Sequence, residues 1–246
     1  MAKCRSKAEL IIAVDDTDCP GDGGTGRVAR AIADRLAERC AVWGVTRHQF
    51  IILPEINYTA KNSGNVVHVM AMPDDLDTLS TELRRWLDEL AVEGSEPGLC
   101  VARTEALVGC ELGRAAQQRF VRREEVRAAA EACGVMLEAV REDVGGIVGA
   151  FCGACLAAQG NDGRFVQHGR IREFRGELTV AEMLAAGVDE VRAGTGERLT
   201  EGKVVAQRLR PALADGRCVL YCSQLADGNY VPVKGRPEQG KVTEAL

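Results

Sequence analysis

The sequence is poor in aromatic residues and has no long apolar run. Only 4% of its 246 residues are Phe, Trp or Tyr, so a platform on which several nucleic-acid bases stack is not expected. No stretch of about 18 apolar residues occurs, which argues against a membrane-spanning helix. The apolar stretch at residues 10–14 is too short for the core of a signal peptide. We therefore expect a cytoplasmic protein without a membrane partner.

An excess of positive charge is also missing. Lys and Arg total 31 against 36 Asp and Glu, a net charge of −5, which argues against broad binding of nucleic acids. The densest basic stretch lies between residues 114 and 127. Its five arginines are Arg114, Arg119, Arg122, Arg123 and Arg127. A solvated helix face and a contact with RNA phosphates are both open interpretations of this stretch.

Hydrophobic residues make up 46% and charged residues 27% of the chain, as in an ordinary globular protein. Apolar periodicity predicts strands over residues 8–14, 49–53, 66–72, 98–103, 135–140, 203–208, 217–222 and 229–233. It predicts helices over residues 25–40, 75–90, 122–133, 144–160 and 179–186. Alternating strands and helices indicate an α/β (α+β) fold, which we divide into a core over 1–170 and a smaller, strand-rich region over 171–246.

The strongest local feature is an acidic strand end followed by glycines. The apolar strand leads directly into Asp15, Asp16 and Asp18, the segment GDGGTG follows at residues 21–26, and a helix begins near Thr25. Glycines let the backbone approach a phosphate, and the start of a helix offers free N–H groups. The carboxylates would repel a bare phosphate, so we expect Mg²⁺ between the acids and the phosphates.

Two other interpretations of this segment stay open. One is a tight turn with surface acids. The other is a phosphatase of the haloacid-dehalogenase type, because Asp16 and Asp18 have the spacing of its nucleophile and acid; Pro20, however, stands where Thr or Val normally follows. A Walker A loop is excluded, because no Gly-Lys-Ser/Thr ending is present.

The segment IIAVDDTDCPGDGGTGRVA resembles the opening of the archaeal agmatinylcytidine synthetases, which modify the anticodon cytidine of an isoleucine tRNA. Thr25 matches the first Thr of that family's Cys-Thr-Thr, which is autophosphorylated there, whereas Gly26 replaces the second. The segment LPEINYTAKNSGNVV resembles a second family motif, with Ser63 in place of an Arg. Residues 146–153 resemble a third motif, and Asp162 falls near an acid that follows it.

The resemblance implies a kinase-like, ATP-binding core with a ferredoxin-like region, and it suggests roles for individual residues. The residues expected to act in catalysis are Asp15, Asp16, Asp18, Thr25 and Lys61, and the three aspartates are also the expected metal ligands. The residues expected to bind the nucleotide are Thr17, Gly21, Gly23, Gly24, Gly26, Asn62, Gly64, Asn65, Gly149 and Asp162.

We accordingly expect an enzyme that uses ATP and Mg²⁺ for phosphoryl transfer to an unknown small molecule or RNA. Within 246 residues we expect no counterpart of the family's oligonucleotide-binding domain and zinc ribbon. A nucleotide or metabolite sensor is the first alternative, motivated by Gly26 and Ser63 at the two departures from the family pattern. An RNA-interaction module or tRNA-modification accessory protein is the second. A homo-oligomer is possible.

Ten cysteines occur without an export signal, so we interpret most of them as buried, reduced side chains. Cys152 and Cys155 form a CxxC pair, for which a redox role or a zinc site shared with Cys218 and Cys222 are alternatives. His68 lies in an apolar strand and is expected in the core, whereas His168 is a candidate for the edge of a site.

Overall fold

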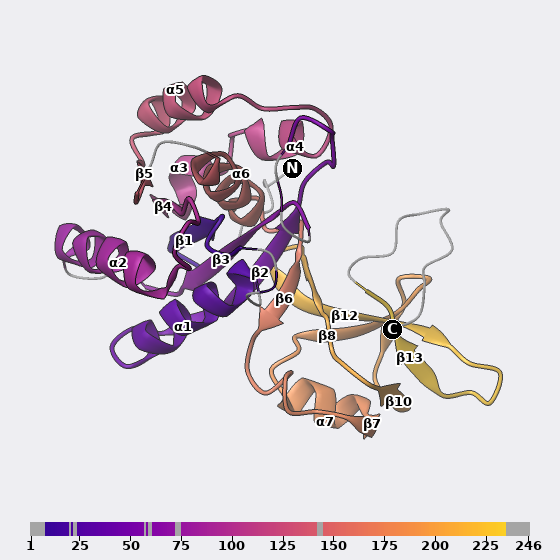
Figure 1. Cartoon of the computed structure of the whole chain (residues 1–246). Helices are drawn as coiled ribbons and strands as arrows, with labels where there is room; N and C mark the ends of the chain where they lie inside the picture. The colour runs from indigo at the N-terminus through magenta and orange to yellow at the C-terminus, as the bar shows by residue number, and fades with distance from the viewer. Residues whose placement is uncertain are drawn as a thin grey trace.

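The computed structural model describes residues 8–19, 21, 24–56, 58, 61–71, 75–141 and 145–234. Across these residues the chain has a mixed α/β fold, built on one 13-stranded sheet and seven helices (Figure 1). The predicted fold class is therefore confirmed. Among the described helices, none combines the length and the apolar character that crossing a bilayer demands.

The first half of the sheet is antiparallel throughout, with β1 at its centre. Its strands, in spatial order, are β5 (Met136–Ala139), β4 (Gly98–Arg103), β1 (Leu10–Asp15), β3 (Ser63–Val69), β2 (Val42–Gln49) and β6 (Arg164–Gln167). Strand β1 pairs with β3 on one side and with β4 on the other. Residues 10–14 of β1 are buried and Asp15 is half-buried, so the strand brings a carboxylate to its carboxyl end.

Helices cover both faces of this half of the sheet (Figure 1). On one face lie α1 (Thr25–Ala37) and α2 (Leu76–Leu90), whose apolar sides pack against Leu10, Ile12 and Val14 of β1. On the other face lie α3 (Thr104–Leu107), α4 (Leu112–Ala116), α5 (Arg123–Cys133) and α6 (Gly146–Ala158). Because the strands alternate their side chains, both faces of β1 bury apolar residues.

The second half of the sheet continues from β6, which pairs with β2 on one side and with β11 on the other. Its remaining elements are β7 (Gly176–Thr179), α7 (Val180–Ala185), β8 (Glu190–Ala193), β9 (Arg198–Leu199), β10 (Lys203–Ala206), β11 (Ala212–Ala214), β12 (Arg217–Gln224) and β13 (Tyr230–Pro232). Phe165 of β6 and Trp43 of β2 join the apolar core of this half. The two parts of the chain are thus linked by one continuous sheet and by the apolar contacts of Trp43 and Phe165.

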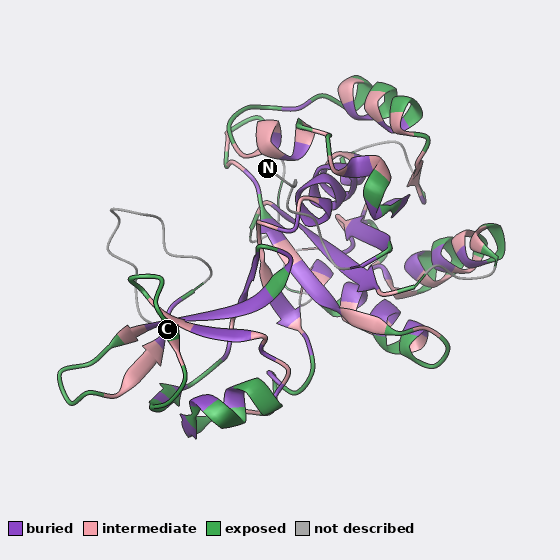
Figure 2. Ribbon diagram, turned by 180° about the vertical axis from the view of Figure 1, so that it is seen from behind, coloured by how far each residue is buried: buried purple, intermediate pink, exposed green. Residues whose placement is uncertain are grey.

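Helix α6 is buried along nearly its whole length, whereas the other long helices keep an exposed side (Figure 2). Small residues make this possible. A Cβ atom on Gly64 of β3 would lie 2.6 Å from the carbonyl oxygen of Gly149, and one on Gly98 of β4 would lie 2.1 Å from the backbone of Gly146. The glycines therefore allow α6 to lie directly on β3 and β4, the two strands that flank β1 and its acidic end.

Most predicted elements appear within a few residues of their expected ends, but the strand predicted over 49–53 is wrong. The strand is β2, which ends at Gln49, and residues 51–53 form no strand. The buried polar side chains of β2 have hydrogen-bond partners. Thr46 Oγ1 forms a hydrogen bond of 2.8 Å with Nε2 of His48 and one of 2.7 Å with Nε2 of His68 on β3. The expected core position of His68 is confirmed, since its side chain is fully buried.

Candidate functional site

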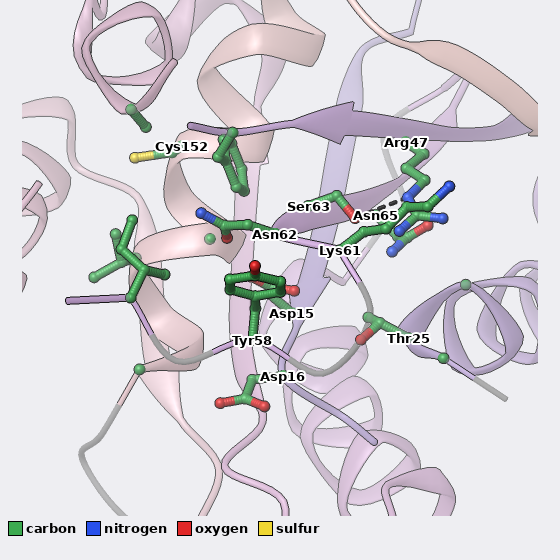
Figure 3. Close-up of a pocket in the computed structure, with 18 of the residues that line it drawn as sticks. Asp15, Asp16, Thr25, Arg47, Tyr58, Lys61, Asn62, Ser63, Asn65 and Cys152 are labelled. Atoms are coloured by element: carbon green, nitrogen blue, oxygen red, sulfur yellow. Dashed lines mark hydrogen bonds between the residues drawn. The ribbon is translucent and has the colours of Figure 1, made fainter. Parts of the chain in front are cut away.

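A cavity of about 1280 Å³ opens where β1 ends. Its walls come from the loop after β1, the start of α1, strands β2 and β3, the start of α6 and the loop between β10 and β11. Figure 3 shows Arg47, Ser63 and Asn65 gathered in one group on the right, with Asp16 apart from them, below Tyr58. Residues far apart in the sequence therefore meet around one hollow.

The acidic segment folds back against the start of α1. Oγ1 of Thr25 donates a hydrogen bond of 2.9 Å to Oδ1 of Asp18. Asp16 has a φ of 53°, in the left-handed region that residues other than glycine seldom occupy. Gly24, with a φ of 82°, precedes the helix and leaves its first N–H groups without a side-chain cap. The turn therefore presents carboxylates and free backbone donors to the same cavity.

Burial strongly disfavours the charged forms of two carboxylates in this turn. It raises the pKa of Asp15 to about 8, and the charges of Asp16 and Asp18 add to the rise while Arg47 opposes it. Burial likewise raises the pKa of Asp16 to about 6, with further contributions from Glu96 and Asp18. At neutral pH Asp15 is therefore mostly protonated, and a cation beside it would favour its ionised form.

A polar wall faces the acidic turn. Nε of Arg47 donates a hydrogen bond of 2.7 Å to Oγ of Ser63. Ser63 stands at the motif position that is an Arg in the resembled family, and here it holds the guanidinium of Arg47 instead. Asn65 is buried, and its Oδ1 has no hydrogen-bond partner among the described residues. A Cβ atom on Gly26 would lie 3.3 Å from that oxygen, so the start of α1 and Asn65 adjoin each other.

The cavity also has many cationic side chains that are not among the residues expected to act in catalysis or to bind the nucleotide. They are Arg30, Arg47, Arg119, Arg122, Arg123, Arg164, Arg172, Arg208, Arg210 and Lys234. An acidic protein therefore has a strongly basic cavity. Three of these residues lie in the basic stretch between residues 114 and 127, but the others come from separate elements, and no local spacing in the sequence connects them.

Most of the predicted site residues line this cavity. They are Asp15, Asp16, Asp18, Gly21, Gly24, Thr25, Gly26, Lys61, Asn62, Asn65 and Gly149. Gly23 lies outside the described residues. Gly149 sits against the carboxylate of Asp15: a Cβ atom there would lie 1.6 Å from Oδ2. The helix thereby sets the position of the acid.

Three predicted nucleotide-binding residues do not line the cavity. Thr17 is fully buried beneath the turn, and Gly64 is the packing contact with α6 described above. Asp162 belongs to a separate network: its carboxylate accepts bonds of 2.9 Å from His48 Nδ1, Arg114 Nη1 and Gln117 Nε2. Burial alone would raise the pKa of Asp162, but these partners lower it. Its position indicates a structural role.

The expected three-aspartate metal site is not preformed. Among the described residues, no group of three or more His, Cys, Asp or Glu side chains lies close enough to hold a metal ion. Asp18 is instead engaged by Thr25. The residues do fit Mg²⁺ in another way, because this ion is commonly held by one or two carboxylates together with phosphate oxygens. Asp15 and Asp16 are the two available carboxylates.

Cys155, Cys218, Cys222 and His168 have structural positions, whereas Cys152, although buried, also lines the cavity. Cys152 and Cys155 lie on the buried helix α6 in one core cluster, whereas Cys218 and Cys222 belong to another, so the two pairs do not meet. A hydrogen bond with Cys155 lowers the pKa of Cys110 to about 6. The ring nitrogens of His168 contact backbone oxygens of Trp43 and Gly187, away from the cavity.

The basic stretch between residues 114 and 127 divides its side chains between two roles. Arg119 forms an ion pair with Glu125 at 2.7 Å, and Arg114 pairs with Asp162. Arg119, Arg122 and Arg123 also line the cavity. The stretch is thus neither a uniformly solvated face nor a continuous basic stripe.

No protein-family model matches the chain, and no curated protein does either. Solved structures do match. A TiaS–tRNA–ATP complex is 19% identical with a TM-score of 0.53, covering 60% of this chain and 36% of that one. Apo TiaS, a tRNA agmatidine synthetase, is 18% identical with a TM-score of 0.51, over 59% of this chain and 35% of that one.

A tRNA fluorescent labeling enzyme is 20% identical with a TM-score of 0.52, again over 59% of this chain and 35% of that one. The chain therefore spans little more than a third of the length of these proteins. At this level of identity the likeness establishes a TiaS-like fold and a distant structural relation. The resemblance noted in the sequence thus extends to the three-dimensional fold.

Proposed function

We propose that this protein binds ATP with a divalent cation in the cavity at the end of β1 and transfers its terminal phosphoryl group. One observation carries the proposal: the carboxylates of Asp15 and Asp16 share the cavity with the uncapped start of α1. Arg47 and Lys61 line the cationic side of the same cavity. Carboxylates, free helix N–H groups and cations in one hollow suit a metal-bound polyphosphate. The structural neighbour TiaS was crystallised with ATP, which supports the proposal.

The start of α1 is the proposed site of the phosphates. Gly24 and Gly26 leave the backbone open there, and the helix dipole favours negative charge at this end. Aromatic side chains at the rim offer a surface for the base: Tyr58 is 41% and Phe120 46% exposed, and both line the cavity. Asn62 and Asn65 are proposed to hydrogen-bond the nucleotide.

Mg²⁺ bound by Asp15 and Asp16 would neutralise charge on the phosphates. The chain's own residues supply the rest. Asp18 accepts the hydroxyl proton of Thr25, so it is positioned to take that proton when the hydroxyl oxygen attacks the γ-phosphorus. A bond forms between Thr25 Oγ1 and phosphorus, the bond from phosphorus to the β,γ-bridging oxygen breaks, and ADP leaves. Lys61 stabilises the charge of the transferring group.

The test is incubation of the protein with γ-³²P-labelled ATP and Mg²⁺, followed by peptide mapping. We expect label on the peptide that contains Thr25. Thr25→Ser retains the hydroxyl and should retain labelling, whereas Thr25→Val removes it and should abolish labelling. Asp16→Asn should lower labelling at least tenfold. Asp77→Asn serves as the matched control, because Asp77 is exposed on α2 and does not line the cavity.

Calorimetry with Mg-ATP separates the outcomes. Absence of nucleotide binding by the wild-type protein contradicts the whole proposal. Binding without release of ADP or labelling instead supports the nucleotide sensor that Gly26 and Ser63 suggested. In that event Asp15→Asn should still weaken binding, because the cation would still bridge carboxylate and phosphate.

A further inference from the structure

The cationic side of the cavity brings five guanidinium groups together, and in the described part of the chain only that of Arg47 interacts with the acidic turn. Arg47 of β2 and Arg164 of β6 are directly opposed in the antiparallel register. Arg208 and Arg210 come from the loop between β10 and β11, and Arg172 follows β6, so four of the five arginines come from residues 164–210. All four lie beyond the segments that carry the sequence resemblance.

Like charges directly opposed on neighbouring strands destabilise a sheet, and partly buried charges normally have a partner. Among the described residues, no carboxylate forms an ion pair with Arg164, Arg172, Arg208 or Arg210. Burial and the charges of Arg208, Arg164, Arg172 and Arg47 lower the pKa of Arg210 to about 10. Burial and Arg47 also lower the pKa of Arg164. The protein keeps a repulsive cluster that an anion would relieve.

A second, smaller cavity of about 20 Å³ lies beside the main one and is lined by Arg172, Arg175, Arg208 and Arg210. Because Arg172, Arg208 and Arg210 line both hollows, the cluster is concave and not a flat basic surface. Arg164 and Arg210 are half-buried at this concave site, and Arg172 and Arg208 are exposed beside them. Such a site suits a compact phosphate group, which arginine binds with two parallel hydrogen bonds. An RNA backbone would instead need an extended basic surface, and the net charge of the protein is −5.

We propose that Arg164, Arg172, Arg208 and Arg210 bind a phosphate group of a phosphorylated small molecule, the second substrate of this enzyme, without a metal ion. This assignment rests on the proposed phosphoryl transfer. It separates two anion sites in one cavity. The site at the start of α1 requires a cation because its carboxylates repel phosphate, whereas the arginine site neutralises phosphate directly.

The test uses thermal unfolding of the full chain with inorganic pyrophosphate as the probe in EDTA, where the cation-dependent site at the start of α1 should not bind it. The response to Mg-ATP is measured separately. At ten times its Kd, pyrophosphate should raise the unfolding temperature of the wild-type protein by about 3 to 6 °C. The double variant Arg164→Gln/Arg210→Gln should lose this rise. Without ligand the same variant should unfold at a higher temperature than wild type at low salt, because a repulsion is removed.

Arg85→Gln, on the exposed side of α2, is the matched control and should respond to pyrophosphate as wild type does. An unchanged pyrophosphate response in the double variant overturns the proposal. The proposal is also overturned if the double variant loses its response to Mg-ATP as well as its response to pyrophosphate. The arginines would then bind the nucleotide itself.

Binding of a single-stranded RNA oligonucleotide that the double variant loses, with no response of wild type to pyrophosphate, also overturns the proposal. If the wild-type protein responds to pyrophosphate but not to Mg-ATP, the proposed function is contradicted, whereas phosphate binding by the arginines is supported.

Discussion

Asp15 shows how one residue can be costly for the fold and useful for binding. Its carboxylate lies against Gly149 at the base of the cavity, where burial raises its pKa to about 8 from 3.8. The folded chain therefore binds a proton that the unfolded chain has already released. This difference links the stability of the protein to pH and to the presence of a cation.

The sign of that link gives the first prediction. A raised carboxyl pKa contributes stability that is present below pH 3.8 and is lost as pH rises through about 8, so the free energy of unfolding should fall across this range in EDTA. Asp15→Asn should flatten the slope and raise the free energy of unfolding at pH 8 by roughly 1 to 4 kcal/mol. Urea denaturation at several pH values measures both effects. A slope equal to that of wild type would contradict the assignment, and Asp77→Asn should leave the slope unchanged.

Gly26 allows binding and folding to be separated at one residue. It is the second residue of α1, where alanine is the better helix former by up to about 1 kcal/mol, so Gly26→Ala should not destabilise the protein. Its new Cβ atom would lie 3.3 Å from Asn65 Oδ1 and 3.4 Å from Arg30 Nη1, inside the proposed nucleotide site. We expect the Kd for Mg-ATP, measured by calorimetry, to rise about tenfold, which is ~1.4 kcal/mol.

Gly109→Ala is the control for this variant, because a Cβ atom on Gly109 would have no neighbour within 4 Å. It should leave the Kd unchanged. A Gly26→Ala variant that binds Mg-ATP as tightly as wild type would place the phosphates away from the start of α1.

At the scale of elements, the packing of α6 on β1 and β3 sets the position of the acidic turn. The helix is buried on the sheet by glycines and alanines, and its first turns lie against the end of β1. A side chain added at the contact must move either the helix or the carboxylate, since interiors are packed closely. The contact is therefore a place where fold and site are coupled.

Two glycines of α6, one turn apart, test that coupling. A Cβ atom at Gly149 would lie 1.6 Å from Asp15 Oδ2, whereas one at Gly153 would meet Val66 Cγ2 at 3.5 Å, an ordinary contact. Gly149→Ala should lower the free energy of unfolding by about 1 to 3 kcal/mol and weaken Mg-ATP binding. Gly153→Ala should be neutral or slightly stabilising. Equal effects of the two substitutions on urea denaturation and calorimetry would show that the contact with Asp15 does not matter.

The same scale explains which elements were predictable. Helices α1, α2 and α5 have clear apolar periodicity and defined ends: Asp75 caps α2, and Gly134 ends α5 with a φ of 62°. Strand β2 was not predicted, because its buried face carries Thr46 and His48, which look solvent-exposed in the sequence. Their burial depends on hydrogen bonds with His68 of β3 and Asp162, which only the folded chain brings near.

At the scale of the whole molecule, the acidic turn and the polar residues 61–65 of the cavity were predictable from the sequence, but most of its cationic side was not. The acidic segment and the start of α1 are contiguous, so the pattern of strand, acids, glycines and helix was visible in one stretch. The cationic side combines β2, β6 and the loop after β10, which meet because one sheet runs through both parts of the chain. Arg47 and Arg164 are 117 positions apart (164 − 47) but directly opposed. No local pattern could relate them.

This continuity predicts that the chain will not separate cleanly at the boundary expected near residue 171. Cutting after residue 170 would remove β11 from the edge of β6 and take from Phe165 its apolar neighbours Leu213 and Leu220. An unpaired strand edge and newly exposed apolar surface on Phe165 favour association. A fragment of residues 1–170 should therefore unfold at lower urea concentration than the full chain and form oligomers, as measured by denaturation and light scattering. If this fragment is monomeric and as stable as the full chain, the two parts are independent domains, and the arginines would then reach the cavity across a movable interface rather than through a shared sheet.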